Sequence, residues 1–179
     1  MKKVIRILLG RYYKVANTFY WKMVAIVYPI FFTKKGTLLY AGVNIGDSFQ
    51  KIFFKYKRVI GFEPNIVNYK RVSHYNRLKG VNIYNYALSD SKGKVKFYLP
   101  DNMNNDASAS LSQFSKNNRY QSREIIEVNA INLCDFLTKH LITEIDFYIS
   151  DIEGYDFKVI KTIAEKFIYT KKIKKMQVE

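Results

Sequence analysis

The chain has 179 residues, of which 48% are hydrophobic and 16% aromatic, which is enough for one domain with a buried core and argues against intrinsic disorder. A single cysteine, Cys134, excludes an intrachain disulfide framework and a cysteine-rich zinc cluster, and the sequence predicts no metal site. One explanation of the formal net charge of +15 is that the protein binds an anionic partner. Drift in composition also explains this charge, because the chain is crowded with residues that AT-rich codons encode, Lys among them.

The N-terminal segment, residues 1–36, differs from the rest of the chain. Residues 1–46 contain no Asp or Glu, and eight Lys and Arg lie there among aliphatic and aromatic residues. A helix with basic and apolar faces can lie on an anionic membrane surface. The apolar run Met23–Phe32 contains Pro29 and is short for a span of about 20 residues. Three interpretations stay open: a helical cap on the following domain, a peripheral membrane contact through residues 1–33, and a marginal span. The expected location is the cytoplasm, free or at a membrane.

From residue 37 onward, apolar segments alternate with amphipathic ones, so we expect strands and helices to alternate. Strands are expected over 37–41, 58–64, 80–90 (with an exit loop), 92–100, 123–128, 145–154 and 173–179, and helices over 48–55, 65–78, 132–140 and 155–167. Asn132 is the expected N-cap of its helix, and Phe157, Ile160, Ile163 and Phe167 are expected to share a face. The polar stretch 102–122 reads as a long loop.

This alternation predicts an α/β fold with a mainly parallel sheet and helices on both faces. Right-handed crossovers then place the strand exits along one edge of the sheet.

A loop with two glycines follows the first expected strand. Gly42 and Gly46 lie four residues apart, with Asn44 between them. Gly42 allows a tight turn, and Gly46 allows another chain or a ligand to approach closely. About twenty residues after this loop, Glu63 ends the second strand, where a nucleoside-binding fold places an acid that accepts both ribose hydroxyls. The alternative is a surface acid that caps a helix, and the spacing from the glycine loop favours ribose binding.

Two further strand exits carry polar residues. Ala87 and Leu88, followed by Asp90, form a plausible slot for adenine, in which Asp90 accepts a hydrogen bond from the exocyclic amine. Asp151 and Glu153 follow the next strand, where the reactive end of a cofactor would lie. The alternative is a pair of acids that the dipole of the next helix favours, and spacing alone does not choose between the two.

Seven stretches occur in a fixed order: GVNIGD, GFEPN, NYALSD, KGKVKFYLP, ASASLS, INLCDFL and DFYISDIEGYDFKVIK. Together they resemble the FkbM family of S-adenosylmethionine-dependent methyltransferases over about Leu38–Glu179. The resemblance implies a Rossmann-like class I methyltransferase domain over residues 37–179. It also implies methyl transfer from S-adenosylmethionine to a hydroxyl of a glycan or small molecule.

Carried over by position, the resemblance implies the site residues. The cofactor would contact Tyr40, Gly42, Asn44, Gly46, Glu63, Pro64, Ala87, Leu88 and Asp90. Asp151 and Glu153 would lie beside the transferred methyl and the acceptor. Our hypothesis is that Asp151 is the base, because an alcohol is a poor nucleophile until it loses its proton, and that Glu153 orients the acceptor.

The chain departs from the family pattern at several positions. Tyr40 stands where an acid usually helps to hold the methionine end, and Ile149 stands where members often have a lysine. Members normally continue after the fifth parallel strand with a helix and an antiparallel hairpin. We therefore expect an exposed strand edge near residues 173–179 that invites pairing with another chain.

Rival functions follow from these departures and from the charge. One is a catalytically inactive or fragmentary binding subunit with the same fold, associated with a membrane or free. A nucleic-acid methyltransferase is not expected, because we find no aromatic and basic stacking pattern beyond general composition. A dehydrogenase would normally carry G-x-G-x-x-G, which is absent here.

Overall fold

The structure, a computed structural model, describes residues 2–100, 111, 122–170 and 172–178. The strands of this described part are β1 (Lys35–Ala41), β2 (Tyr56–Phe62), β3 (Val81–Tyr84), β4 (Ala87–Ser89), β5 (Gly93–Pro100), β6 (Ser122–Asn132), β7 (Phe147–Ser150) and β8 (Met176–Val178). Its α-helices are α1 (Lys2–Phe31), α2 (Ile66–Val72), α3 (Leu133–Lys139) and α4 (Asp156–Ile163). Short 3₁₀ turns form η1 (Phe49–Lys51), η2 (Phe53–Lys55) and η3 (Ser73–Arg77), and a π-helical turn forms η5 (Ala164–Ile168).

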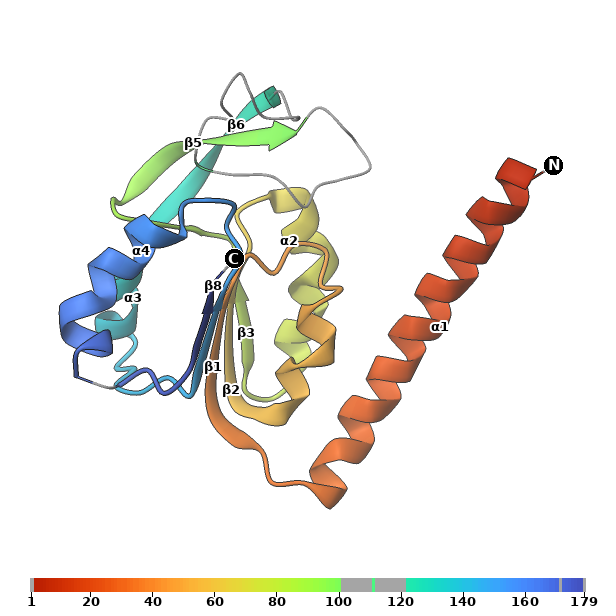
Figure 1. Cartoon of the computed structure of the whole chain (residues 1–179), viewed down its shortest axis with the longest axis horizontal. Helices are drawn as coiled ribbons and strands as arrows, with labels where there is room; N and C mark the ends of the chain where they lie inside the picture. The colour runs from red at the N-terminus through yellow and green to blue at the C-terminus, as the bar shows by residue number, and fades with distance from the viewer. Residues whose placement is uncertain (1, 101–110, 112–121, 171, 179) are drawn as a thin grey trace.

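Five parallel strands form a central sheet in the order β3-β2-β1-β7-β8. From β1 the chain proceeds outward through β2 to β3, and it later returns to the other side of β1 to form β7 and β8 (Figure 1). The strand order therefore reverses between β1 and β7. Open α/β sheets bind ligands at such a switch point, outside the carboxyl ends of the strands. The predicted α/β fold with a mainly parallel sheet is confirmed.

Alternating side chains of the central strands enter two cores, one on each face of the sheet. Leu38 and Tyr40 lie in the first core, which η1, η2, α2 and part of α1 cover. Leu39 and Ala41 lie in the second core, which α3 and α4 cover. Helical segments therefore cover both faces, as predicted.

A second sheet has the order β4-β6-β5. Figure 1 shows its strands β5 and β6 above the carboxyl ends of the central strands. The strand expected within residues 80–90 is β3, which ends at Tyr84, but its expected exit loop contains a further strand, β4, which pairs in parallel with β6. Side-chain alternation accounts for β4: Ala87 lies in the small core of the second sheet, and the next residue, Leu88, lies in the second core of the central sheet.

The shorter helices differ from their predictions in detail. Residues 48–55 form the 3₁₀ turns η1 and η2 rather than an α-helix, and the helix expected over 65–78 is α2 followed by η3. Asn132 is the N-cap of α3, as predicted, with its Oδ1 accepting from the backbone N–H of Asp135 at 3.2 Å. Phe157 does not share the buried face of α4, since 77% of its surface is exposed.

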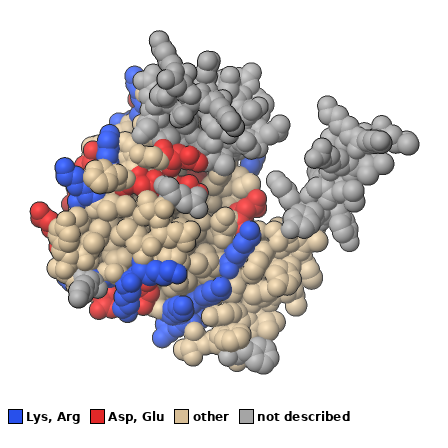
Figure 2. All heavy atoms as spheres, viewed as in Figure 1, with Lys and Arg blue, Asp and Glu red and all other residues tan. Residues whose placement is uncertain are grey.

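Helix α1 packs on the first core through one side of its C-terminal half. The ring of Trp21 stacks on Phe54 with centroids 6.2 Å apart, and Tyr28 contacts Phe54 edge-on at 5.2 Å. This packing agrees with the predicted cap. The remaining described surface of α1 is mostly tan in Figure 2, and the N-terminal turns stand away from the sheet in Figure 1. Among the described residues, the helices lack the apolar length that a membrane crossing needs.

At the other end of the chain, β8 is an edge strand of the central sheet and pairs in parallel with β7, as predicted. The pairing of this edge with another chain stays a prediction. The predicted loop over 102–122 lies outside the described residues, apart from Leu111 and Ser122.

Candidate functional site

The loop after β1 approaches the backbone that follows β7. Gly42 has φ +80°, and a Cβ there would lie 2.0 Å from the backbone oxygen of Asp151, so no other residue fits without a backbone shift. Gly46 has φ +90°, and a Cβ there would lie 3.1 Å from Cγ1 of Val72. Protein atoms therefore occupy the space beside both glycines, including the space at Gly46 that we expected another chain or a ligand to approach.

Glu63, at the end of β2, lies beside this loop and is only 4% exposed. Its Oε2 accepts from the backbone N–H of Asn44 at 2.6 Å, and its Oε1 accepts from the backbone N–H of Asn65 at 2.8 Å. The alternative of a surface acid is wrong, although Glu63 does bond the residue that caps α2.

Buried or half-buried asparagines surround Glu63, and sequence reasoning missed two of them. Asn68 donates through Nδ2 to Oδ1 of Asn44 at 3.0 Å. Asn85 donates through Nδ2 to the backbone oxygens of Glu63 and Pro64, both at 2.8 Å. Neither has a sequence signal of its own, because asparagines are common throughout this chain. Together they hold the exit of β2 against the glycine loop and the chain after β3.

A narrow hollow, which we call the crevice, opens at the strand exits. Its cavity volume is about 20 Å³. Its lining residues are Gly42, Phe62, Pro64, Tyr86, Ala87, Leu88, Phe97, Leu111 and Ile152. Four of the predicted cofactor residues, Gly42, Pro64, Ala87 and Leu88, thus come together here from the exits of β1 and β2 and from β4.

A second hollow, which we call the cleft, lies on the first-core face of the sheet and has a cavity volume of about 350 Å³. Its lining residues are Tyr40, Ser48, Lys51, Ile52, Lys55, Ile149, Asp151 and Gln177. Tyr40 is buried and contacts the ring of Phe49 edge-on at 5.6 Å, so it also belongs to the core. The cleft therefore brings the half-buried carboxylate of Asp151 together with a phenol and two lysines.

Residues that are neighbours in the chain line the crevice and the cleft near the switch point of the sheet. The backbone N–H of Asp151 donates to the oxygen of Ala41 at 3.2 Å, which carries the β1–β7 pairing past the end of the strands. Asp151 lines the cleft and the next residue, Ile152, lines the crevice. A ligand that occupies both hollows would pass beside the contact between Gly42 and Asp151.

Five predicted site residues line neither hollow: Asn44, Gly46, Glu63, Asp90 and Glu153. Glu153 is exposed, in a turn with φ 54°. Asp90 is also exposed, and its Oδ1 accepts from the hydroxyl of Tyr155 at 2.8 Å and from that of Ser89 at 3.2 Å. The bond from Tyr155 and, to a lesser degree, that from Ser89 lower the pKa of the Asp90 carboxyl. Asp90 thus connects the end of β4 to the start of α4 instead of lining the crevice.

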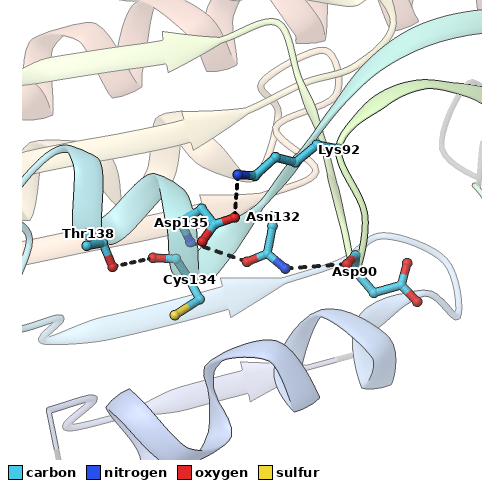
Figure 3. A network of polar contacts seen from close by, with 6 residues as sticks. All are labelled: Asp90, Lys92, Asn132, Cys134, Asp135 and Thr138. Carbon is cyan, nitrogen blue, oxygen red and sulfur yellow. Dashed lines mark hydrogen bonds and ion pairs between the residues drawn. The ribbon is translucent and has the colours of Figure 1, made fainter.

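Figure 3 shows the neighbouring polar network that fixes the backbone of Asp90. Its backbone oxygen accepts from Nδ2 of Asn132 at 3.4 Å, while its carboxylate points away from Asn132 (Figure 3). Lys92 forms a 2.7 Å ion pair with Asp135 of α3. These contacts connect the turn between β4 and β5 to the first turn of α3.

A buried polar chain connects β7 to α4. The hydroxyl of Tyr148 donates to Oγ of Ser150 at 3.1 Å, and Ser150 donates in turn to Oδ1 of the buried Asp156. Burial is the main cause that raises the pKa of Tyr148. Both ends of the turn that carries Asp151 are therefore held in the interior, which sequence reasoning did not foresee.

Comparison with protein families places this geometry in context. Residues 41–179 match the family model described as the methyltransferase FkbM domain. No curated protein and no solved structure matches the chain. The match begins at the last residue of β1 and includes every residue of the crevice.

Proposed function

The chain belongs to the FkbM methyltransferase family, and from that premise we propose that it transfers the methyl group of S-adenosylmethionine to a hydroxyl of a glycan or small molecule. One observation carries the choice of donor: the buried carboxylate of Glu63 is bound to the backbone of the glycine loop at the switch point of the sheet. That is the position from which an acid holds the ribose of a nucleoside.

The residues around this carboxylate suit an adenosine group. Pro64, Ala87, Leu88 and Phe97 give the crevice apolar walls, which favour a flat aromatic ring. Glu63 would accept from the ribose hydroxyls, and the buried amide of Asn68, whose Oδ1 has no hydrogen-bond partner among the described residues, adds a polar atom nearby. These residues therefore supply the kinds of group that bind the nucleoside part of the donor, namely apolar walls and a buried acid.

The cleft would take the methionine part and the acceptor. Lys51 and Lys55 bring positive charge that would pair with a carboxylate, and Tyr40 brings a phenol in place of the acid that the family usually has there. S-adenosylmethionine, when bound, supplies a methyl group on a positively charged sulfur.

The acceptor hydroxyl needs a base, and we assign that role to Asp151. Its side chain lines the cleft, whereas Glu153 lies in an exposed turn outside it. The Asp151 carboxylate would accept the proton of the hydroxyl as its oxygen takes the methyl group that S-adenosylmethionine would supply. The cleft walls hold the hydroxyl in line for this displacement.

Titration calorimetry with S-adenosylmethionine tests the donor. We expect a micromolar dissociation constant, and Glu63→Gln is expected to weaken binding by about ten- to a hundredfold, the equivalent of one hydrogen bond to a charged group. Glu124→Gln, on the exposed side of β6, is the matched control and should leave the affinity unchanged. Circular dichroism checks that both variants are folded.

The rival function, a binding subunit without catalysis, has its own support in Tyr40, which is buried where the family usually has an acid. The same titration separates the two functions. No heat of binding at millimolar S-adenosylmethionine would favour the noncatalytic subunit and contradict the proposed transfer.

A further inference from the structure

A large hollow lies far from the strand exits, between α1 and the 3₁₀ turns that cover the first core. We call it the groove, and its cavity volume is about 430 Å³. Aromatic rings form its walls, among them Trp21, Phe54 and Tyr75. Lys22, Lys34 and Lys79 also line it, and its lining contains no Asp or Glu. The groove thus combines apolar walls with positively charged lysine side chains.

The outer side of α1 continues this apolar surface. Phe19, Ile26 and Ile30 are 67%, 65% and 72% exposed, and Met23 and Val27 line a shallow apolar hollow on the side away from the groove. Soluble monomers seldom expose so many large apolar side chains in one patch, and such patches mark membrane or protein contacts.

The charge around this patch indicates which of these contacts it makes. Residues 1–46 contain no acid, and none of the ion pairs between described residues involves the three lysines of the groove. Figure 2 shows a diagonal row of blue side chains beside the tan surface of the C-terminal half of α1. Lysines that border apolar side chains place their charge at the level of lipid headgroups while their stems lie along the apolar surface.

We propose that the C-terminal half of α1 and the groove form a docking surface for an anionic phospholipid bilayer. Phe19, Ile26 and Ile30 enter the interface between headgroups and acyl chains, and Lys22, Lys34 and Lys79 contact phosphate groups. A protein partner would need an apolar face bordered by acids. An anionic bilayer presents an apolar interior bordered by negatively charged phosphate groups across its whole surface. We therefore propose a bilayer rather than a protein as the partner.

Vesicle sedimentation tests the proposal with the full chain. We expect binding to vesicles that contain phosphatidylglycerol, weak binding to pure phosphatidylcholine, and loss of binding as salt rises. Replacing the three groove lysines by Gln should weaken binding to the anionic vesicles by about a hundredfold, since each lysine near a membrane surface contributes about fivefold. The control triple variant, Lys96→Gln, Lys139→Gln and Lys161→Gln, makes the same change in net charge at exposed positions elsewhere and should bind as the original chain does.

A second variant tests the apolar contribution. Phe19→Ser with Ile30→Ser changes two exposed side chains, so it should keep the fold and lose vesicle binding even at low salt. Equal losses in the groove and control triple variants would overturn the proposal, because binding would then follow net charge alone. Absence of vesicle binding, together with a dimer in sedimentation velocity that Phe19→Ser disrupts, would overturn it in favour of self-association.

Discussion

At the scale of single residues, the candidate site depends on how Asp151 and Gly42 meet. Asp151 is half-buried at the end of β7, its backbone is bonded to β1, and its carboxylate lines the cleft. The proposed role as base requires this carboxylate to lie within hydrogen-bonding distance of the acceptor hydroxyl.

Asp151→Asn is expected to lower the rate of methyl transfer by about a hundredfold or more, because an amide cannot act as the base. The affinity for S-adenosylmethionine should stay unchanged, since the variant keeps the shape of the side chain. Transfer of radiolabelled methyl to a panel of glycans and hydroxylated small molecules measures the rate. Glu153→Gln is the matched control, and an equal or larger loss in that variant would contradict the assignment.

Gly42→Ala is expected to reduce the free energy of unfolding more than Gly154→Ala does. The two glycines have nearly equal dihedral angles, φ +80° and +84°, so each substitution carries a similar strain of about 1–3 kcal/mol. Only at Gly42 does the new Cβ also meet a backbone oxygen, whereas nothing lies within 4 Å at Gly154. Urea unfolding measures both variants, and equal losses would show that the close approach of Asp151 is not a constraint.

At the scale of elements, the connection between β7 and α4 determines where the cleft carboxylate lies. Tyr148, Ser150 and Asp156 form a buried hydrogen-bonded chain across this connection. Buried polar groups of this kind are costly when unpaired, so the chain favours one arrangement of the turn between the two elements.

Tyr148→Phe is expected to cost about 0.5–1.5 kcal/mol of unfolding free energy at neutral pH through the lost hydrogen bond. Burial raises the pKa of Tyr148 in the folded chain above its ordinary value of 10.0. In the unfolded chain the hydroxyl loses its proton near pH 10 while the folded chain retains it, so the original protein loses stability as the pH rises above that value.

The Tyr148→Phe variant has no phenolic proton to lose at this position, so the stability difference between the two proteins should shrink above about pH 10. Urea unfolding from about pH 7 to about pH 11 measures that difference on both sides of the ordinary tyrosine pKa. Tyr20→Phe, at an exposed position, is the control. A difference that stays constant over the whole range would contradict the burial of the hydroxyl.

At the scale of the whole molecule, α1 and the sheet share the first core. Trp21, the single tryptophan of the chain, packs on this core and stacks on Phe54. Elements that share one core are expected to unfold together in a single cooperative transition.

Tryptophan fluorescence and far-ultraviolet circular dichroism should therefore give the same urea midpoint. Fluorescence reports Trp21 in its contact with Phe54, and circular dichroism reports the helices and strands as a whole. A fluorescence change at a clearly lower urea concentration would show that α1 leaves the core before the domain unfolds.

Local pattern accounts for the parts of the fold and site that sequence reasoning predicted correctly. Asn132 caps α3 because a short side chain with an oxygen acceptor bonds the first turn of a helix wherever that helix begins. Phe157 was predicted wrongly because a face read from apolar residues alone does not reveal which side of α4 meets the sheet. The buried positions are Val159, Ile163 and Phe167, four residues apart.

The sequence by itself determined the alternation of strands and helices, the glycine loop, and the acid that follows the second strand, since each depends on neighbouring residues or on short spacings. Only the tertiary structure decided that β4 joins a second sheet, that Asp151 lines the cleft while Glu153 and Asp90 lie outside both hollows, and that α1 leaves an apolar side uncovered. These outcomes depend on contacts between segments far apart in the chain, and no local pattern of residues specifies such contacts.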